Sequence, residues 1–435
     1  MILSQRRWWV FAALSLIFFF LNGATFASLG VVLFSMISEL HWSLTQAGES
    51  FSLLGISCGL ASPLPALLMR RIGCRRVVVL GGLCLAAGFW LAYAASGLSL
   101  FFIAMVFLGL GYALAGNIPG VYLIASWFPK VSARMIGLYL MIGAAGNVVG
   151  PPLVAAIVAA SHSWRFNWLL MGLLAIACTV FCLVFIRDRP AATTVPDTAD
   201  MATVAATAKA TVIAQAPITG RTTAAYGAAH STRSPWRERQ AMQTPQFGLV
   251  AASMTLTIAG ITTNSSVAVT HLVHLGTTPA FAAFILSLVA LVATLFKGVS
   301  GRLSEIVRPS RILAAGLVLQ AIGDVAFSSG AAATNAYLFA GAFGMGWGLS
   351  YVAANVLLLD YFGRDVGARI LSVVWMISTL AAAGPVAAGM IADRYGTFGP
   401  VYSVYAALLL VAALPIFLMR APVSPPGAMA RRDAR

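Results

Sequence analysis

Ionisable side chains are scarce in the apolar stretches of this 435-residue chain, and Lys297 is the basic residue placed most deeply in them. It stands in the run LVATLFKGVSGRLSE, residues 291–305. A lysine ammonium in a low-dielectric cavity attracts a carboxylate strongly and can also change its protonation. A lysine within about one turn of a membrane surface can instead extend its head group into water. Lys297 is therefore either an anchor for an organic anion or a residue that snorkels to the interface.

Asp324, in the run LQAIGDVAF, is an acid embedded in another apolar stretch. A charged group within hydrocarbon costs about 2.5–3.5 kcal/mol on insertion scales, so it indicates a partner or a function. We interpret Asp324 as a candidate proton site. His271 and His274 lie one helical turn apart, but a metal site needs more ligands than this pair supplies. We therefore favour a pH-sensitive gate or a simple interfacial pair, and we expect no metal and no cofactor.

Neutral polar side chains recur at mid-depth in several apolar stretches and are suited to line a polar pocket within a membrane. The alternative for each is a hydrogen bond between helices of the bundle. The candidate substrate-binding residues beside Lys297 are Asn22, Tyr112, Asn117, Asn264, His271, Tyr351, Asn355 and Trp375.

The composition determines the kind of element that must position these residues. Of the 435 residues, 60% are hydrophobic and 9% are charged, which no soluble globular domain of this length tolerates on its surface. The formal charge of +15 does not indicate nucleic-acid binding, because the basic residues stand in short connections between apolar runs rather than on one soluble face. The solvent for most of the chain is therefore a lipid bilayer.

Apolar stretches of about twenty residues, the length needed to span a bilayer, predict an all-α polytopic membrane protein with twelve transmembrane helices. The predicted helices cover residues 9–36, 46–69, 77–95, 100–126, 135–160, 166–186, 246–272, 279–301, 310–330, 335–361, 368–392 and 398–419. They form two six-helix bundles, 1–187 and 246–420, joined by a disordered cytoplasmic linker, 188–245, rich in Ala and Thr, and followed by a basic tail, 421–435.

Every second connection is basic, whereas the others hold little beyond Arg165 and Arg394. The positive-inside rule then predicts that both termini and the linker lie in the cytoplasm. The first apolar run has small residues near Ala24 and Ala27, as a cleavable signal peptide does, but it continues to about Ile37. We therefore interpret it as the first membrane helix of a protein of a bacterial inner membrane.

Corresponding connections in the two halves are similar, which indicates a duplication with pseudo-two-fold symmetry. Residues 66–82 read ALLMRRIGCRRVVVLGG, and residues 301–316 read GRLSEIVRPSRILAAG. Each begins with a small residue, turns tightly among arginines and enters an apolar helix. The small residue allows close helix packing, and the cations anchor the turn at the inner surface.

The two halves and these connections resemble the major facilitator superfamily, whose signature after the second helix has Gly, Asp, Arg, Gly and Arg at fixed spacing. Arg71, Gly73 and Arg75 match it, whereas Ala66 replaces the first Gly and Arg70 replaces the Asp. The second copy keeps Gly301 and an acid, Glu305. The resemblance covers nearly the whole chain except the linker, and it implies a conformational-coupling role for Arg71, Gly73, Arg75, Gly301 and Glu305.

Within that superfamily, RIGCRRVVVLGG resembles the loop of monocarboxylate porters and of bacterial oxalate/formate-exchanger-like proteins. Further segments match that branch in order: HWSLTQAGESFSLL, GLGYALAGNIP, WFPKVSARMIGLYLMIGAAGNVVGPPL, SWRFNW and AAAGPVAAGMIADRYG. The resemblance implies that the first, fourth, seventh and tenth helices line the cavity and that a cation on the eighth meets the substrate carboxylate.

Lys297 occupies the position of that cation, where the branch usually has Arg. Lysine cannot form the same two-pronged hydrogen bond with a carboxylate, so substrate preference is expected to differ from that of better known members. The first helix has Asn22, Thr25 and Ser28 but not the lysine that couples protons in eukaryotic porters. Coupling to protons and exchange of anions both remain open.

We therefore predict a secondary active transporter for a small organic anion, a monocarboxylate or short dicarboxylate, that works by alternating access. Its expected partners are that solute, protons and the bilayer. No catalytic cluster and no GxxxxGK[ST] motif is present, which argues against an enzyme and an ATP-driven pump. A broad-specificity efflux permease and a non-transporting solute receptor are the alternatives; the near absence of acids in the first six helices disfavours export of cations.

Overall fold

The computed structural model describes residues 2–128, 132–187, 236–304, 306–328, 330 and 333–422, and the elements assigned among them are helices. The first half holds α1 (Ile2–Ala24), α2 (Leu29–Leu40), α3 (Leu44–Ala61), α4 (Leu64–Ile72), α5 (Cys74–Ala94), α6 (Leu98–Ala115), α7 (Asn117–Trp127), α8 (Ser132–Ser161) and α9 (Trp164–Phe185). The second half holds α12 (Glu238–Met242), α13 (Pro245–His274), α14 (Pro279–Leu303), α15 (Pro309–Ser328), α16 (Ala333–Phe362), α17 (Arg364–Ile377), the 3₁₀ helix η1 (Ser378–Ala382), α18 (Ala383–Tyr395) and α19 (Gly399–Leu418).

Eleven helical stretches of the described residues are long and apolar enough to cross a membrane, and the bent pair α3 and α4 makes a twelfth when the two count as one span. The stretch Arg6–Leu40 unites α1 with α2, and Leu98–Ile124 runs from α6 into α7. The prediction of an all-α polytopic protein with twelve spans is thereby confirmed, with the second span bent.

Prolines break two helices that the sequence pattern predicts as continuous. Between α3 and α4, within the predicted helix 46–69, the axis bends by 49° where Pro63 precedes α4 and Pro65 lies in its first turn. Within the predicted helix 368–392, η1 separates α17 from α18, and Pro385 follows it. Proline has no N–H to donate to the carbonyl four residues earlier, and its ring clashes with that carbonyl. An unbroken helix is therefore wrong for 46–69, whereas most of 368–392 stays within one span, Val373–Tyr395, that contains a 3₁₀ turn.

Hydroxyl side chains begin several of the spanning helices. The Ser163, Thr244 and Thr278 hydroxyls accept hydrogen bonds from backbone N–H groups three residues later, at 3.3, 3.3 and 3.2 Å. These bonds satisfy N–H groups that the first helical turn leaves without a partner. Proline also stands in the first turn of α13 and α14, where its missing N–H costs nothing.

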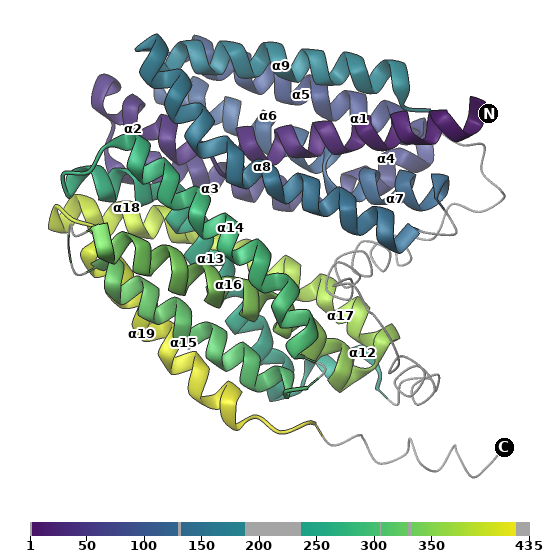
Figure 1. Cartoon of the computed structure of the whole chain (residues 1–435), viewed down its shortest axis with the longest axis vertical. Coiled ribbons are helices and arrows are strands. Elements are labelled where there is room, and N and C mark those ends of the chain that lie inside the picture. The colour runs from purple at the N-terminus through teal and green to yellow at the C-terminus, as the bar shows by residue number, and fades with distance from the viewer. Residues whose placement is uncertain are drawn as a thin grey trace.

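The same packing recurs in the two halves: α5 packs on α6 and α9 in the first, and α15 packs on α16 and α19 in the second. The halves meet where α3 packs on α18, α8 on α14 and α2 on α13. From the side with α2 and α18, the two sets of helices diverge toward the side where α1 begins and α19 ends (Figure 1). We call this second side the basic end, since Arg70 at the end of α4, Arg75 at the start of α5 and Arg187 after α9 lie there, and the other the opposite end.

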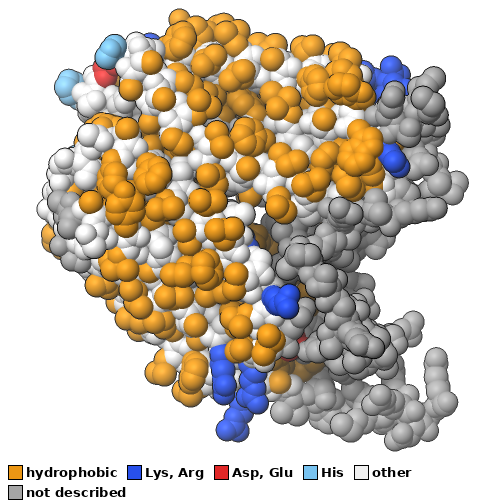
Figure 2. All heavy atoms as spheres, in the orientation of Figure 1, with side chains coloured by type: hydrophobic (Ala, Val, Ile, Leu, Met, Phe, Trp, Pro, Cys, Tyr) orange, Lys and Arg blue, Asp and Glu red, His pale blue; other side chains and the backbone are white. Residues whose placement is uncertain are grey.

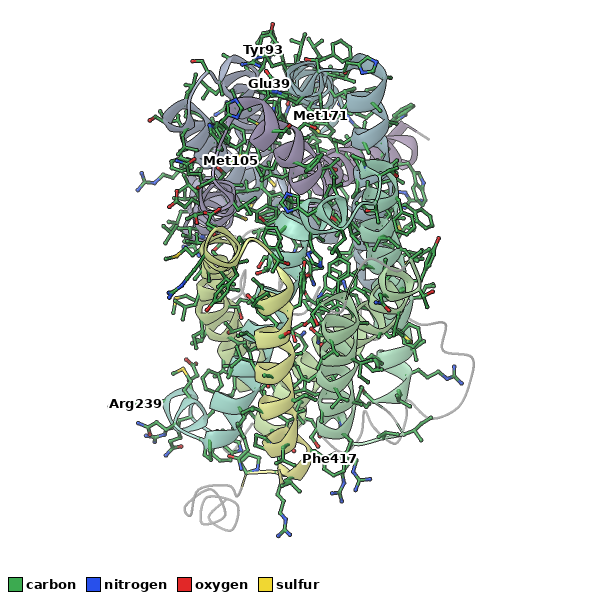
Figure 3. The ribbon with its side chains drawn as sticks, turned by 90° about the vertical axis from the view of Figure 1, so that its left-hand side faces the viewer. Glu39, Tyr93, Met105, Met171, Arg239 and Phe417 are labelled. Atoms are coloured by element: carbon green, nitrogen blue, oxygen red, sulfur yellow. The ribbon has the colours of Figure 1, made fainter. Side chains whose placement is uncertain are left out.

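The outer surface of both halves is apolar, as contact with lipid requires. Orange side chains cover much of each half in Figure 2, whereas blue ones gather toward the basic end. Viewed from the opposite end, the first half, with Glu39 and Tyr93, lies above the second, with Arg239 and Phe417 (Figure 3). The interior space between the halves is therefore the place to seek a functional site.

Residues 188–235, most of the predicted linker, and the tail from 423 onward lie outside the described residues. The described end of the linker is ordered, which shifts the predicted start of the second half from residue 246 to Trp236. The reason is apolar contact: Trp236 is buried and packs edge-on against Phe362, with ring centres 5.4 Å apart. Division of the rest into two bundles, a disordered linker and a tail stays a prediction.

Candidate functional site

A cavity of about 200 Å³ lies between the two halves. Both halves contribute to it: α1, α3, α6 and α8 from the first, and α13, α14 and α16 from the second. Its walls are mainly apolar, with amides and hydroxyls at intervals. The lining residues are Asn22, Phe26, Ala27, Phe51, Tyr112, Asn147, Pro151, Ile261, Thr262, Ser265, Leu286, Val289, Ala290 and Trp347.

Two of the predicted residues meet in the first-half wall. The Tyr112 hydroxyl of α6 donates to Asn22 Oδ1 of α1 at 3.0 Å, and Asn22 Nδ2 donates to the Phe18 carbonyl of its own helix at 2.8 Å. Phe26 packs edge-on against Tyr112, with ring centres 5.2 Å apart. This bonded pair holds a polar patch in place on an otherwise apolar wall, and its orientation is set by the two helices.

Lys297 lies directly behind the second-half wall. Its Nζ is 4.3 Å from the centre of the Trp347 ring and 5.1 Å from that of Tyr351. Trp347 lines the cavity and Lys297 does not, so the ammonium contacts a ring of the cavity wall. Trp375 packs edge-on against Tyr351, with ring centres 5.6 Å apart. The structure thus links Lys297, Tyr351 and Trp375 by ring contacts, and it adds Trp347, which the sequence pattern did not single out.

Glycines in α16 bring that helix close enough to α14 to form this cluster. A Cβ at Gly348 would lie 2.5 Å from the Ala293 carbonyl oxygen and 3.0 Å from the backbone nitrogen of Lys297. A Cβ at Gly344, one turn earlier, would lie 2.9 Å from the Val289 carbonyl oxygen. Only glycine allows this approach, which places Lys297 against the rings of the facing helix.

The other predicted polar residues do not line the cavity. Asn264 and Asn355 are buried within the second half, and Asn355 Nδ2 donates to the Tyr351 carbonyl. Asn117 is half-buried at the start of α7, just after the break that separates this helix from α6. Their role as substrate ligands is not supported by their position.

His271 is also turned away from the cavity. Its ring packs against Phe327, Phe398 and Tyr402, and Nε2 lies 3.0 Å from the Phe327 carbonyl oxygen. On α13, Asn264 and His271 are two turns apart on one face, whereas the cavity face presents residues 261, 262 and 265. Periodicity alone does not tell which polar face of a membrane helix meets the cavity.

Asp324 lies inside the second half on α15, a helix that does not line the cavity. It is 1% exposed, and its Oδ2 has no hydrogen-bond partner among the described residues. Its helix packs against α19 within the second half. The structure leaves an acid buried in the bundle, apart from the candidate substrate residues.

Among the predicted coupling residues, Gly73 joins α4 to α5 with a φ of 85°, a conformation that favours glycine. Arg75 donates from Nε to the Leu183 carbonyl at 3.2 Å, near the end of α9. Arg71 is exposed at the end of α4, and Gly301 lies in the last turn of α14. Glu305 lies outside the described residues.

The two halves are bonded directly at the opposite end. The Asp393 carboxylate of α18 accepts hydrogen bonds from the backbone N–H groups of Leu44 and Thr45, at 3.0 and 2.9 Å, and from the Thr45 hydroxyl. These N–H groups belong to the first turn of α3, so the carboxylate stabilises a helix N-terminus of the other half. A Cβ at Gly389 would lie 2.4 Å from the Leu44 carbonyl oxygen, which shows how closely the backbones approach.

At the basic end the halves separate. There α4 packs on α5, α6 and α7 of its own half, and α17 packs on α12, α13 and α16 of its own. The halves are thus packed together through α3 and α18 at the opposite end, whereas their helices diverge toward the basic end (Figure 1).

Sequence analysis did not select Trp347, Asn147 and Asp393. A signal existed for the first two, because they stand in the glycine-rich runs GAFGMGWG and GAAGNVVGPP, which also serve helix packing. Trp347 is one turn from Tyr351. Among the described residues, no group of three or more His, Cys, Asp or Glu is placed to hold a metal ion.

The chain belongs to the Major Facilitator Superfamily, since the model of that family matches residues 15–272 and 249–435. Its relatives are transporters, not enzymes. The sequence resemblance to this superfamily is thereby confirmed, and curated relatives named as monocarboxylate transporters support the resemblance to that branch.

Curated relatives match parts of the chain. Monocarboxylate transporter 12-B of Danio rerio is 26% identical over 33% of this chain and 30% of its own. Monocarboxylate transporter 14 of Mus musculus is 32% identical over 34% of this chain and 29% of its own. The probable L-galactonate transporter of Escherichia coli is 29% identical over 41% of this chain and 39% of its own. The chain thus aligns with less than half the length of each.

Solved structures of the same fold cover nearly all of the chain. The nucleoside transporter NupG superposes with a TM-score of 0.69 over 95% of this chain and 98% of its own, at 14% identity. A single-residue variant of that protein also superposes with a TM-score of 0.69, over 94% of this chain and 99% of its own. At this identity the likeness shows the fold alone.

Proposed function

We propose that this protein is a secondary transporter that carries a small organic anion through the cavity between its halves, with Lys297 as the anchor for the anion. The supporting observation is the Lys297–Trp347 pair, because it places an ammonium 4.3 Å from the centre of a ring that lines the cavity. A cation–π contact is worth about 0.5–2 kcal/mol. A hydrogen bond between charged groups contributes about 1.5–3 kcal/mol. A carboxylate that hydrogen-bonds to Nζ therefore offsets the loss of one cation–π contact.

Cavity size and charge favour a monocarboxylate or a short dicarboxylate. The cavity of about 200 Å³ is smaller than the roughly 300–1,000 Å³ of sites for drug-sized ligands. The polar groups of Asn22, Tyr112 and Asn147 can orient hydroxyl or carbonyl groups of the solute, and the apolar wall accepts its carbon skeleton. Relatives named as monocarboxylate and probable L-galactonate transporters support an acidic solute.

Alternating access explains the contrast between the two ends. The opposite end is closed by Asp393 and the α3–α18 contact, whereas the helices diverge toward the basic end. By the positive-inside rule the basic end, with both termini, faces the cytoplasm of a bacterial inner membrane. In this assignment the structure is open inward, and rocking of the halves exposes the cavity outward.

Transport into proteoliposomes tests the anchor. We expect the parent protein to exchange labelled carboxylates, from a panel of acetate, lactate, pyruvate and oxalate. Lys297→Gln should raise the KM for the preferred acid about 10- to 100-fold, the loss of one charged hydrogen bond. Lys297→Arg should retain more of the uptake than Lys297→Gln, because it keeps the charge.

Arg311→Gln is the matched control, since it removes one cation from an exposed position at the start of α15. Equal KM values for Lys297→Gln and Arg311→Gln would show that Lys297 does not bind the anion. Uptake of uridine or of a cationic dye, without uptake of any acid, would contradict the proposed solute class and favour a nucleoside carrier or a broad exporter. Ligand binding with no measurable flux would favour a receptor.

A further inference from the structure

A second hollow, of about 690 Å³, lies on the outer side of the first half. It is formed where α5 packs on α9, the two helices farthest from the second half in Figure 1. Three arginines, Arg75, Arg76 and Arg187, lie at the basic end of this groove. Its wall includes Leu80, Leu83 and Leu183. Cations therefore adjoin an apolar surface at the edge of the membrane-spanning region.

The three arginines differ in their contacts and in their exposure. Arg75 donates from Nε and Nη2 to the Leu183 carbonyl, one of the last carbonyls of α9, which helical bonding leaves without a partner. Arg75 thus joins the two helices and forms the base of the groove. Arg76 and Arg187 are exposed, so their guanidinium groups are accessible to a ligand.

The charge of this region favours an anion. Residues 1–187 contain two acids, Glu39 and Glu49. Glu39 pairs with Arg165, at 3.0 Å, at the opposite end. Glu49 lies in the second turn of α3, also toward the opposite end. Asp188 follows Arg187 in the sequence, outside the described residues, so the groove has three cations against at most one nearby acid of the first half.

The apolar wall selects among anions. The side chains of Leu80, Leu83 and Leu183 are 39%, 53% and 45% exposed, on helices whose outer faces meet lipid. A soluble anion gains nothing from that wall, whereas a phospholipid places acyl chains against it and a phosphate at the arginines. Arginine suits phosphate because its planar fork donates two parallel hydrogen bonds.

We propose that this groove binds an anionic phospholipid of the leaflet at the basic end. Arg76 and Arg187 bind its phosphate, and the leucines contact its acyl chain. Basic pockets between transmembrane helices on the cytoplasmic side have the chemistry for such head groups. The site is separate from the cavity between the halves and does not depend on the transported solute.

Lipid binding to the full purified chain tests the proposal. The chain is delipidated in detergent, and phosphatidylglycerol or phosphatidylcholine is titrated while bound lipid is counted by native mass spectrometry. We expect phosphatidylglycerol to bind about 30-fold more tightly than phosphatidylcholine, since each of two arginines near the surface contributes about a fivefold factor. The double variant Arg76→Gln/Arg187→Gln should lose this preference.

The double variant Arg311→Gln/Arg420→Gln removes the same charge from the basic end of the second half and should keep the preference. If both double variants lost the preference for phosphatidylglycerol equally, the preference would come from the total positive charge of the protein rather than from this groove, and the proposal would be overturned. Displacement of the phospholipid by millimolar inorganic phosphate would show a soluble-anion site instead. Identical binding of phosphatidylglycerol by the parent and by Arg76→Gln/Arg187→Gln would overturn the proposal. Occupation of the groove by residues 188–235 of the chain itself would also overturn it.

Discussion

At the scale of single residues, the two embedded charges have different surroundings. Lys297 is half-buried between the rings of Trp347 and Tyr351, next to the cavity. Asp324 is almost fully buried within the second half, with one oxygen that has no hydrogen-bond partner among the described residues. A buried, uncompensated carboxylate costs several kcal/mol. Lys297 is therefore suited to meet a solute, and Asp324 to exchange a proton when the bundle rearranges.

Asp324→Asn tests that second role, because it keeps the size of the side chain and removes its ionisation. If the carrier is proton-coupled through Asp324, the variant should lose accumulation of the acid driven by a pH gradient but keep exchange of labelled for unlabelled acid. Both fluxes are measured in proteoliposomes. Asp360→Asn, at an exposed position of α16, is the control. Gradient-driven accumulation equal to that of the parent would exclude Asp324 as the proton site.

At the scale of helices, the contact between α14 and α16 positions Lys297, the proposed anion anchor. Gly344 and Gly348 let α16 approach the backbone of α14 where Lys297 emerges. Lysine reaches the rings of Trp347 and Tyr351 because these stand one turn apart on the same face of the partner helix. Small residues allow such backbone approaches in membranes, where packing rather than a hydrophobic driving force holds helices together.

Gly348→Ala should separate these two helices. Its Cβ would lie 2.5 Å from the Ala293 carbonyl oxygen, and overpacking of this kind costs about 1–3 kcal/mol. We expect a lower midpoint of thermal unfolding in detergent and weaker anion uptake. Gly341→Ala, in the same helix, has open space around its Cβ and should be neutral or slightly stabilising. Equal midpoints for the two variants would contradict this role of Gly348.

At the scale of the whole molecule, the proposed alternating access requires two open states, and the balance between them depends on contacts that exist in one of them. The hydrogen bonds from the first turn of α3 to Asp393 join the halves at the opposite end and must break when that end opens. In contrast, the pair of Glu39 with Arg165 lies within the first half and is unaffected by rocking. Asp393 therefore stabilises the state seen here.

Asp393→Asn should shift the population toward the state open at the opposite end, about tenfold for the loss of a partly exposed charged contact. Spin labels on cysteines at Ser38 and Tyr395, both exposed at that end, should report longer distances. Glu39→Gln, the control, should leave the distances unchanged. The same distance distribution in parent and Asp393→Asn would show that this contact does not set the balance.

Much of the fold was predictable because its signals are local. Each span can be located by hydropathy because exposing backbone polar groups or charges to lipid is costly. The orientation of the spans follows from the basic connections, which alternate along the chain. The break at Pro63 and the 3₁₀ turn before Pro385 were missed although these prolines stand in the sequence, since a run of apolar residues outweighs a proline in a hydropathy window. Trp236 was placed in the linker because its partner, Phe362, is distant in sequence.

The sequence by itself determined that twelve helices span a bilayer, that the connections at one end are basic, and that Lys297 is the embedded cation. Only the tertiary structure decided which polar residues face the cavity. Asn22 and Tyr112 line it, whereas Asn264 and His271 point into the second half. The physical reason is that membrane helices are apolar on every side, so no amphipathic pattern marks the cavity face. That face is set by the neighbours a helix packs against.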